Sequence, residues 1–257
     1  MTPTETGFLI IGVIVVMAMI AFTIQSIENQ RRERRMRLLL LKDQIRRADH
    51  LLRSLPEHYI TREIRDLLVR YLMQRWKLTL ELERTDDNLK RLQEVESVAS
   101  QPIPVVEHPA GSMTLHTDRN HASRTASLLR ELFQFLSEVK QQGLFKPSDI
   151  DTVTYQVKEA YTRTRIDVEL MDTYEAEQAR GAAAALPRFR TAMAKLQSLN
   201  STQQLDRQMY EIGTHIDELE VIVKRERLEK EEEERRRREE EQAKEDKFRP
   251  KPFTDYR

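Results

Sequence analysis

The histidines are the side chains best suited to metal binding or proton transfer, and their positions keep them apart. One group lies in or beside a proline-rich segment: His108, His116 and His121. The others are single residues on separate predicted helices: His50, His58 and His215. His116 and His121 are five positions apart, a spacing that does not bring two side chains onto one helical face. No His-Glu-x-x-His, Glu-x-x-His or aspartate-rich calcium motif occurs, so we expect no metal site and no cofactor.

Other catalytic residue types form no motif either. Cysteine is absent, which excludes disulfides, thiolate zinc sites and cysteine nucleophiles. The six glycines are too far apart for a phosphate-binding loop, and no serine lies in a nucleophile elbow. Carboxylates alternate with arginine and lysine, a pattern typical of solvated helix faces. We therefore expect no catalytic residues and predict that the protein is not an enzyme.

Arginines near aromatic rings could bind nucleic acid, because guanidinium groups hold phosphates and rings stack on bases. Two groups qualify: Arg62, Arg65, Arg70 and Arg75 around Trp76, and Arg163 and Arg165 beside Tyr161. Acidic residues alternate with them, namely Glu63, Asp66, Glu81, Asp167 and Glu169. The chain has 43 basic and 43 acidic residues and a net charge of +0, so no global field attracts nucleic acid. We expect these arginines to form ion pairs along their helices.

A membrane anchor is predicted near the N-terminus. The segment 8–24 contains no charge, and with the next three residues it is long enough, about 30 Å as a helix, to cross a bilayer. A cleaved signal peptide is the competing interpretation, but no basic residue precedes Phe8 and no small-residue cleavage site follows. Basic residues follow directly: Arg31, Arg32, Arg34, Arg35 and Arg37. Such residues stay on the cytoplasmic side, which predicts a single-pass inner-membrane protein with its N-terminus outside. The same arginines could bind anionic lipid head groups.

Helical periodicity dominates the remaining sequence. The anchor is expected to continue as one rod to Pro56, followed by a helix over 59–99 and a proline-rich linker over 101–117. Further helices are predicted from near Ala122 to Gly143, from a cap at Ser148 or Asp149 to Arg180, from Pro187 to Leu199, and from a cap at Ser201 or Thr202. Short connections make these three antiparallel pairs.

An internal similarity links the first two pairs. A shift of 88 positions aligns 40–45 with 128–133 and 69–85 with 157–173 without gaps. Shared amphipathic periodicity produces such matches by chance as well, so duplication and coincidence both stay open. Duplication would favour stacked hairpins, which commonly bind other proteins.

The C-terminal region is highly charged. Glutamate and arginine alternate in blocks at i,i+4 spacing over 224–247, and no apolar stripe follows Leu228. We expect a solvated helix, with a disordered polyampholyte as the alternative. The tail that follows contains aromatic residues and prolines that could form a partner-binding motif: Phe248, Pro250, Pro252, Phe253 and Tyr256.

These patterns predict an all-α protein with a single N-terminal transmembrane helix, antiparallel helical hairpins in a bundle or short solenoid, and a long charged C-terminal helix. The expected order is an extracytoplasmic N-terminus (1–7), transmembrane helix (8–27), first hairpin (28–100), linker (101–117), second and third hairpins (118–223), charged helix (224–247) and flexible tail (248–257).

The function expected from this layout is a non-catalytic, membrane-anchored scaffold or adaptor that binds a protein partner. Two alternatives stay open. A membrane-tethered nucleic-acid-associated protein would need one contiguous basic surface around Trp76 and Tyr161. A self-assembling coiled-coil protein, present as a homo-oligomer, would need an exposed apolar stripe on the helix predicted over 59–99.

Overall fold

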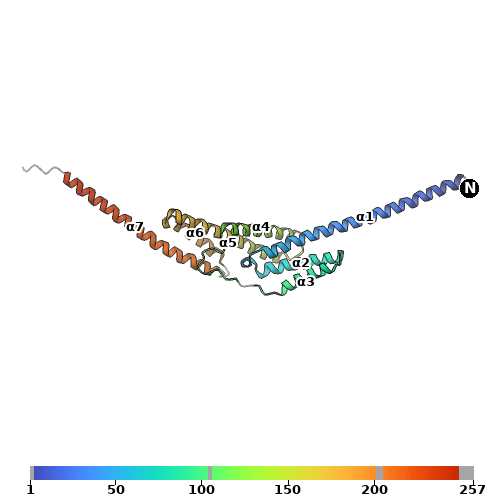
Figure 1. Ribbon diagram of the computed structural model, residues 1–257, viewed down its shortest axis with the longest axis horizontal. Coiled ribbons are helices and arrows are strands. Elements are labelled where there is room, and N and C mark those ends of the chain that lie inside the picture. Colours follow the sequence, from blue (N-terminus) through green and yellow to red (C-terminus); the bar gives the residue numbers. More distant parts are fainter. Residues whose placement is uncertain (1–2, 104–105, 201–204, 249–257) are drawn as a thin grey trace, which may run out of the picture. The chain divides into compact units, whose positions relative to one another are not determined.

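Helices are the only regular secondary structure in the residues that the computed structural model describes, which are 3–103, 106–200 and 205–248 (Figure 1). Within them, the side chains of 3–16, 18, 20, 21, 243 and 245–248 lie outside the description. The elements are α1 (Pro3–Ser54), a 3-10 turn (Glu57–Tyr59), α2 (Arg62–Leu82), α3 (Asp86–Ser100), α4 (Arg119–Gln141), α5 (Pro147–Arg180), α6 (Ala182–Leu199) and α7 (Asp206–Phe248). The described residues contain no strand, which confirms the all-α class.

The chain divides into two compact units. Unit 1 comprises Met1–Val106 and Glu131–Val157, and unit 2 comprises Glu107–Arg130 and Lys158–Arg257. Each unit therefore contains part of α4 and part of α5. The prolines of the linker predicted over 101–117 lie on both sides of the boundary, and its residues from Glu107 onward belong to unit 2.

The core of unit 1 is built from the end of α1, the length of α2 and parts of α3, α4 and α5. Its largest buried side chains on α2 are Ile64, Leu67, Leu68, Tyr71 and Leu72. The rings of Tyr71 and Phe135 meet edge to face with centroids 4.9 Å apart, which joins α2 to α4. Arg47 of α1 lies above this contact and pairs with Glu138 at 2.7 Å. The apolar face of α2 is thus covered inside unit 1.

The prediction of one helix over 59–99 is wrong, because the structure starts it later and divides it into α2 and α3. A 3-10 turn ends at Tyr59, and the side chain of Thr61 accepts a hydrogen bond from the Ile64 backbone at 3.3 Å to cap α2. α2 ends at Leu82, and the hydroxyl of Thr85 caps α3 by accepting from the Asn88 backbone at 3.3 Å. A threonine with two aspartates after it is a helix start, and it overrides the continuous apolar periodicity.

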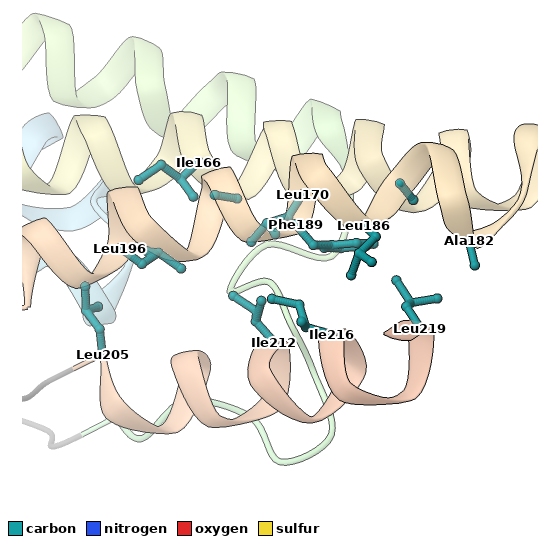
Figure 2. Packing of buried hydrophobic residues seen from close by; sticks show 12 residues of the cluster. Ile166, Leu170, Ala182, Leu186, Phe189, Leu196, Leu205, Ile212, Ile216 and Leu219 are labelled. Carbon is teal, nitrogen blue, oxygen red and sulfur yellow. The ribbon is translucent and has the colours of Figure 1, made fainter. Parts of the chain in front are cut away.

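Unit 2 has a second core, in which α6 packs against α7 (Figure 2). The ring of Phe189 lies among Leu186, Ile212 and Ile216, and Leu170 of α5 reaches the same cluster. Phe189 is fully buried, and its ring meets that of His215 edge to face at 5.0 Å.

α4 and α5 pair as an antiparallel hairpin. Within unit 1, Lys140 near the end of α4 pairs with Asp151 near the start of α5. Within unit 2, Arg119 at the start of α4 pairs with Asp172 and Glu175 far along α5. The connection contains Gly143 at a φ of 65°, the left-handed conformation predicted for a helix stop.

Two predicted helix starts differ from those observed, and a third lies outside the described residues. α5 begins at Pro147, before the expected cap at Ser148 or Asp149, because proline is well suited to the first helical position. α6 begins at Ala182 after Gly181 and contains Pro187 in its interior, because four alanines extend the helix backward. The predicted caps Ser201 and Thr202 lie outside the described residues.

α1 continues without interruption from Pro3 to Ser54, which includes the predicted anchor and the rod after it. Among the described residues, no helix combines the length and the apolar character that a membrane span requires. Most side chains of the predicted anchor, those of 8–16, 18, 20 and 21, lie outside the described set.

α7 carries the charged region as one helix through Phe248. Its described side chains beyond Leu228 are exposed, and i,i+4 pairs such as Arg227 with Glu231 at 2.9 Å lie along it. The proposed duplication stays a prediction: Val69 and Val157 are both buried, whereas buried Ile45 aligns with the exposed Phe133.

Candidate functional site

The arginine cluster after the predicted anchor lies on the surface of α1. Arg31, Arg32, Arg34, Arg35 and Arg37 are all exposed. Arg34 donates a hydrogen bond to the carbonyl of Leu82 at the end of α2, and Arg37 pairs loosely with Glu33 at 3.9 Å. Guanidinium groups in this position remain available to water and to anions, as a topology or head-group site requires.

The predicted partner motif in the tail lies outside the described residues. This applies to the positions of Pro250, Pro252, Phe253 and Tyr256 and to the side chain of Phe248.

A buried polar network lies in unit 2, where the sequence indicated only a solvated helix face. Asp167 of α5 is fully buried, and its carboxylate accepts hydrogen bonds from Gln208 Nε2 at 2.8 Å and from the Leu115 backbone at 3.0 Å. Gln208 also donates to the Met113 carbonyl at 3.0 Å and accepts from Arg163 Nε at 3.1 Å. Burial raises the pKa of Asp167 despite these hydrogen bonds and the nearby Arg163 charge.

The network fastens residues 107–118, which we call the strap, onto α5 and α7. The Gly111 backbone donates to Glu211 of α7 at 3.0 Å, and the His108 ring lies 2.6 Å from the Ser112 carbonyl. Periodicity could not predict this role, because the strap has none. The available signals were Asp167 on the apolar side of a predicted helix and the polar Gln208 among its apolar neighbours.

Two histidines that the sequence analysis kept apart lie next to each other. His116 is in the strap and His121 is in the first turn of α4, and their Nδ1 atoms are 3.4 Å apart. Their spacing still does not place them on one helical face; they meet because His116 lies before α4 and only His121 lies on it. His116 is buried, and its Nε2 faces Asp167 Oδ2 at 3.9 Å. No three histidine or acidic side chains converge on a metal-sized site in the described part of the chain.

The first turn of α4 is held by Asp118. Its carboxylate accepts a hydrogen bond from the His121 backbone at 2.8 Å, which fixes the position of His121. This hydrogen bond keeps the pKa of Asp118 below its ordinary value.

Some of the arginines near Trp76 and Tyr161 contact side chains of their own unit. In unit 1, Arg75 donates to Gln142 and lies over the Tyr71 ring at 4.8 Å, and Arg70 faces Asp149 at 3.7 Å. In unit 2, Arg163 is engaged with Gln208 as described. Of these contacts only Arg70 with Asp149 is an ion pair, and it joins α2 to α5. Along α2 itself, Arg62 lies 3.7 Å from Asp66, and the side chains of Arg62 and Arg70 are 82% and 52% exposed. Ion pairing along the helices therefore stays a prediction.

Unit 1 also has a concave apolar surface. A cavity of about 240 Å³ opens between the end of α1, the 3-10 turn and α3. Its apolar lining is Leu52, Ile60, Val95, Val98, Pro102 and Ile103.

Comparison with known proteins gives no family assignment. The chain matches no protein-family model, curated protein or solved structure. Function must therefore be argued from the geometry of this chain alone.

Proposed function

We propose that the protein is a non-catalytic, membrane-anchored scaffold that holds its helical units at the cytoplasmic face and binds a protein partner there. The observation that carries the proposal is the continuity of α1. The helix runs unbroken from Pro3 to Ser54, and its last turns contribute Ile45, Ala48 and Leu51 to the core of unit 1. One helix therefore contains both the apolar segment 8–24 and the residues that pack into the core of unit 1.

The exposed arginines support the orientation. Arg31 to Arg37 begin about 10 Å beyond Ile24 along the helix axis, at the depth of a head-group layer. Arginines at the end of a spanning helix remain in the cytoplasm, so the N-terminus faces outward.

The distance between the anchor and unit 1 is short. Arg34 contacts the carbonyl of Leu82, and Arg34 lies about 15 Å beyond Ile24 at 1.5 Å of rise per residue. Lys42 pairs with Glu83 at 3.0 Å in the same corner between α2 and α3. This corner is consequently held near the membrane without a flexible linker. Confinement to a surface raises the effective concentration of the unit toward other membrane components.

Two observations favour the scaffold over the alternatives. Acidic side chains lie beside the arginines near Trp76, with Asp66 facing Arg62 and Asp149 facing Arg70, which breaks up a basic surface and weighs against nucleic-acid binding. Within the segment 59–99, the apolar face of α2 is covered and Leu89 on α3 is 46% exposed, which weighs against self-assembly through α2.

The experiment is a membrane preparation of the full chain combined with topology reporters. We expect extraction by detergent but not by carbonate, and activity of a cytoplasmic reporter fused after Arg257. Recovery in the soluble fraction, or reporter activity only on the opposite side, would contradict the proposal.

Partner binding is tested by affinity purification of the detergent-solubilised full chain. It is compared with a variant that lacks 224–257 and with Val98→Glu, a change in the apolar lining of the unit 1 cavity. Lys158→Glu, an exposed change in unit 2, is the matched control. Loss of the main co-purifying protein only on deletion of 224–257 assigns binding to the C-terminal region, and loss only in Val98→Glu assigns it to the unit 1 cavity. Absence of any co-purifying protein that is specific to the native chain contradicts the adaptor role.

A further inference from the structure

The contact between His116 and His121 has the geometry of a metal-binding pair. Their Nδ1 atoms are 3.4 Å apart and their ring planes are inclined at 80°. This separation is that of a long hydrogen bond between the two rings. Two zinc–nitrogen bonds of about 2.05 Å across 3.4 Å enclose an angle of about 110°, which is tetrahedral.

The surroundings of His116 resemble the second shell of a metal site. A metal-bound histidine usually directs its other ring nitrogen toward a carboxylate, which fixes the ring and its tautomer. Here Nε2 of His116 lies 3.9 Å from the buried Asp167 carboxylate, about 1 Å longer than a hydrogen bond, while Nδ1 lies 3.4 Å from Nδ1 of His121. Asp167 is itself held by Gln208 and by the Leu115 backbone. A shift of about 1 Å in the His116 ring would bring its Nε2–H within hydrogen-bond distance of this carboxylate.

A metal ion would reach the two histidines from the solvent on the side of His121. Its side chain is exposed at the first turn of α4, and Asp118 fixes its backbone. A metal ion between the two Nδ1 atoms would therefore have protein on one side and solvent on the other. Water molecules would complete its coordination.

We propose that His116 and His121 bind one divalent transition-metal ion of the zinc, nickel or copper class. Imidazole nitrogen suits these ions, whereas magnesium and calcium require oxygen ligands. The ion bridges the strap and the start of α4, so its binding stabilises the attachment of the strap to unit 2. The inference does not depend on membrane anchoring, because both ligands and their supporting groups lie in unit 2.

The test uses the untagged, detergent-solubilised full chain, titrated with Zn²⁺ in competition with a chromophoric chelator. His121→Ala is the decisive variant, because the side chain is exposed and its removal leaves the unit 2 core intact. His50→Ala is the matched control, since it removes an exposed histidine on α1 in unit 1. We expect one Zn²⁺ per chain, affinity at least tenfold lower in His121→Ala, and no change in His50→Ala. Circular dichroism verifies that both variants fold.

A second measurement identifies the ligands. Cu²⁺ bound to the native chain should show nitrogen superhyperfine coupling in its electron paramagnetic resonance spectrum, with one nitrogen fewer in His121→Ala. Zn²⁺ should raise the melting temperature of the native chain but not that of His121→Ala, and Mg²⁺ should raise neither. Equal Zn²⁺ affinity in the native chain and His121→Ala would overturn the proposal. So would the absence of binding at millimolar Zn²⁺, which would leave the contact as a hydrogen bond between two imidazoles.

Discussion

Replacing Leu72 with alanine tests whether α2 is a covered core helix or an open assembly surface. Leu72 is 0% exposed in unit 1, whereas Leu40 on α1 is 61% exposed. Leucine to alanine removes three carbon groups, worth about 2.4 kcal/mol when fully buried at about 0.8 kcal/mol each. The cavity left in a packed core brings the total to about 3–5 kcal/mol. Because the Leu40 side chain is already mostly exposed to solvent, Leu40→Ala should lower the unfolding free energy by about 1 kcal/mol or less.

The fluorescence of Trp76 reports these changes, because it is the only tryptophan and it lies on α2 in unit 1. Urea unfolding of the solubilised full chain, followed through this signal, should show a much lower midpoint for Leu72→Ala than for Leu40→Ala. The slope of the transition should be unchanged if the same surface is exposed on unfolding. Equal midpoints for the two variants would refute the covered core. A concentration-dependent midpoint in the native chain would point to assembly instead.

Three further predictions concern local features. Burial raises the pKa of Asp167. Its contribution to stability is therefore fully present below its unfolded pKa of about 4 and is lost as the pH rises through the folded pKa. Asp167→Asn should flatten this pH dependence of stability in thermal unfolding measured across pH 4–7. Gly181→Ala should lower the unfolding free energy of unit 2 by about 1–2 kcal/mol, because its φ of 84° disfavours a Cβ atom, and Gly213→Ala, inside α7, is the control without that strain. Thr85→Ala should cost about 1 kcal/mol by removing the α3 cap, and Thr85→Ser should restore it in the same urea assay; an unchanged midpoint in Thr85→Ala would contradict the capping role.

Regular elements were predictable from the sequence where one local signal dominated. The stop at Gly143 and the break at Pro56 depend on backbone conformations that neighbouring residues cannot override. The interruption between α2 and α3 was missed because apolar residues continue at helical spacing on both sides of it. A single threonine hydroxyl decides that boundary, and Thr85 is recognisable as a cap only when the two aspartates after it are taken into account.

The candidate site was harder to predict because it depends on contacts between distant positions. His116 and Asp167 are separated by 51 positions, and nothing periodic connects them. Asp167 was counted among charges that neutralise neighbouring arginines along α5. Its burial follows from the side of α5 on which it lies, since Ile166 and Leu170 beside it belong to the unit 2 core. Helical register alone would have placed this carboxylate against packed helices.

Two polar side chains of unit 2, Asp167 and Gln208, are buried next to each other. An aspartate seldom becomes fully buried unless it is paired, and a glutamine seldom lies wholly inside a helical core. Here both occur beside the strap and the two histidines, while the α6–α7 contact nearby follows the ordinary apolar pattern. Proteins tend to break local rules where function requires it and to compensate elsewhere. If this region required hydrophobic packing alone, apolar side chains in place of Asp167 and Gln208 would stabilise unit 2 as well as the polar pair does. Asp167 and Gln208 are instead placed to hold the backbone of Leu115 and Met113, which an apolar side chain could not do.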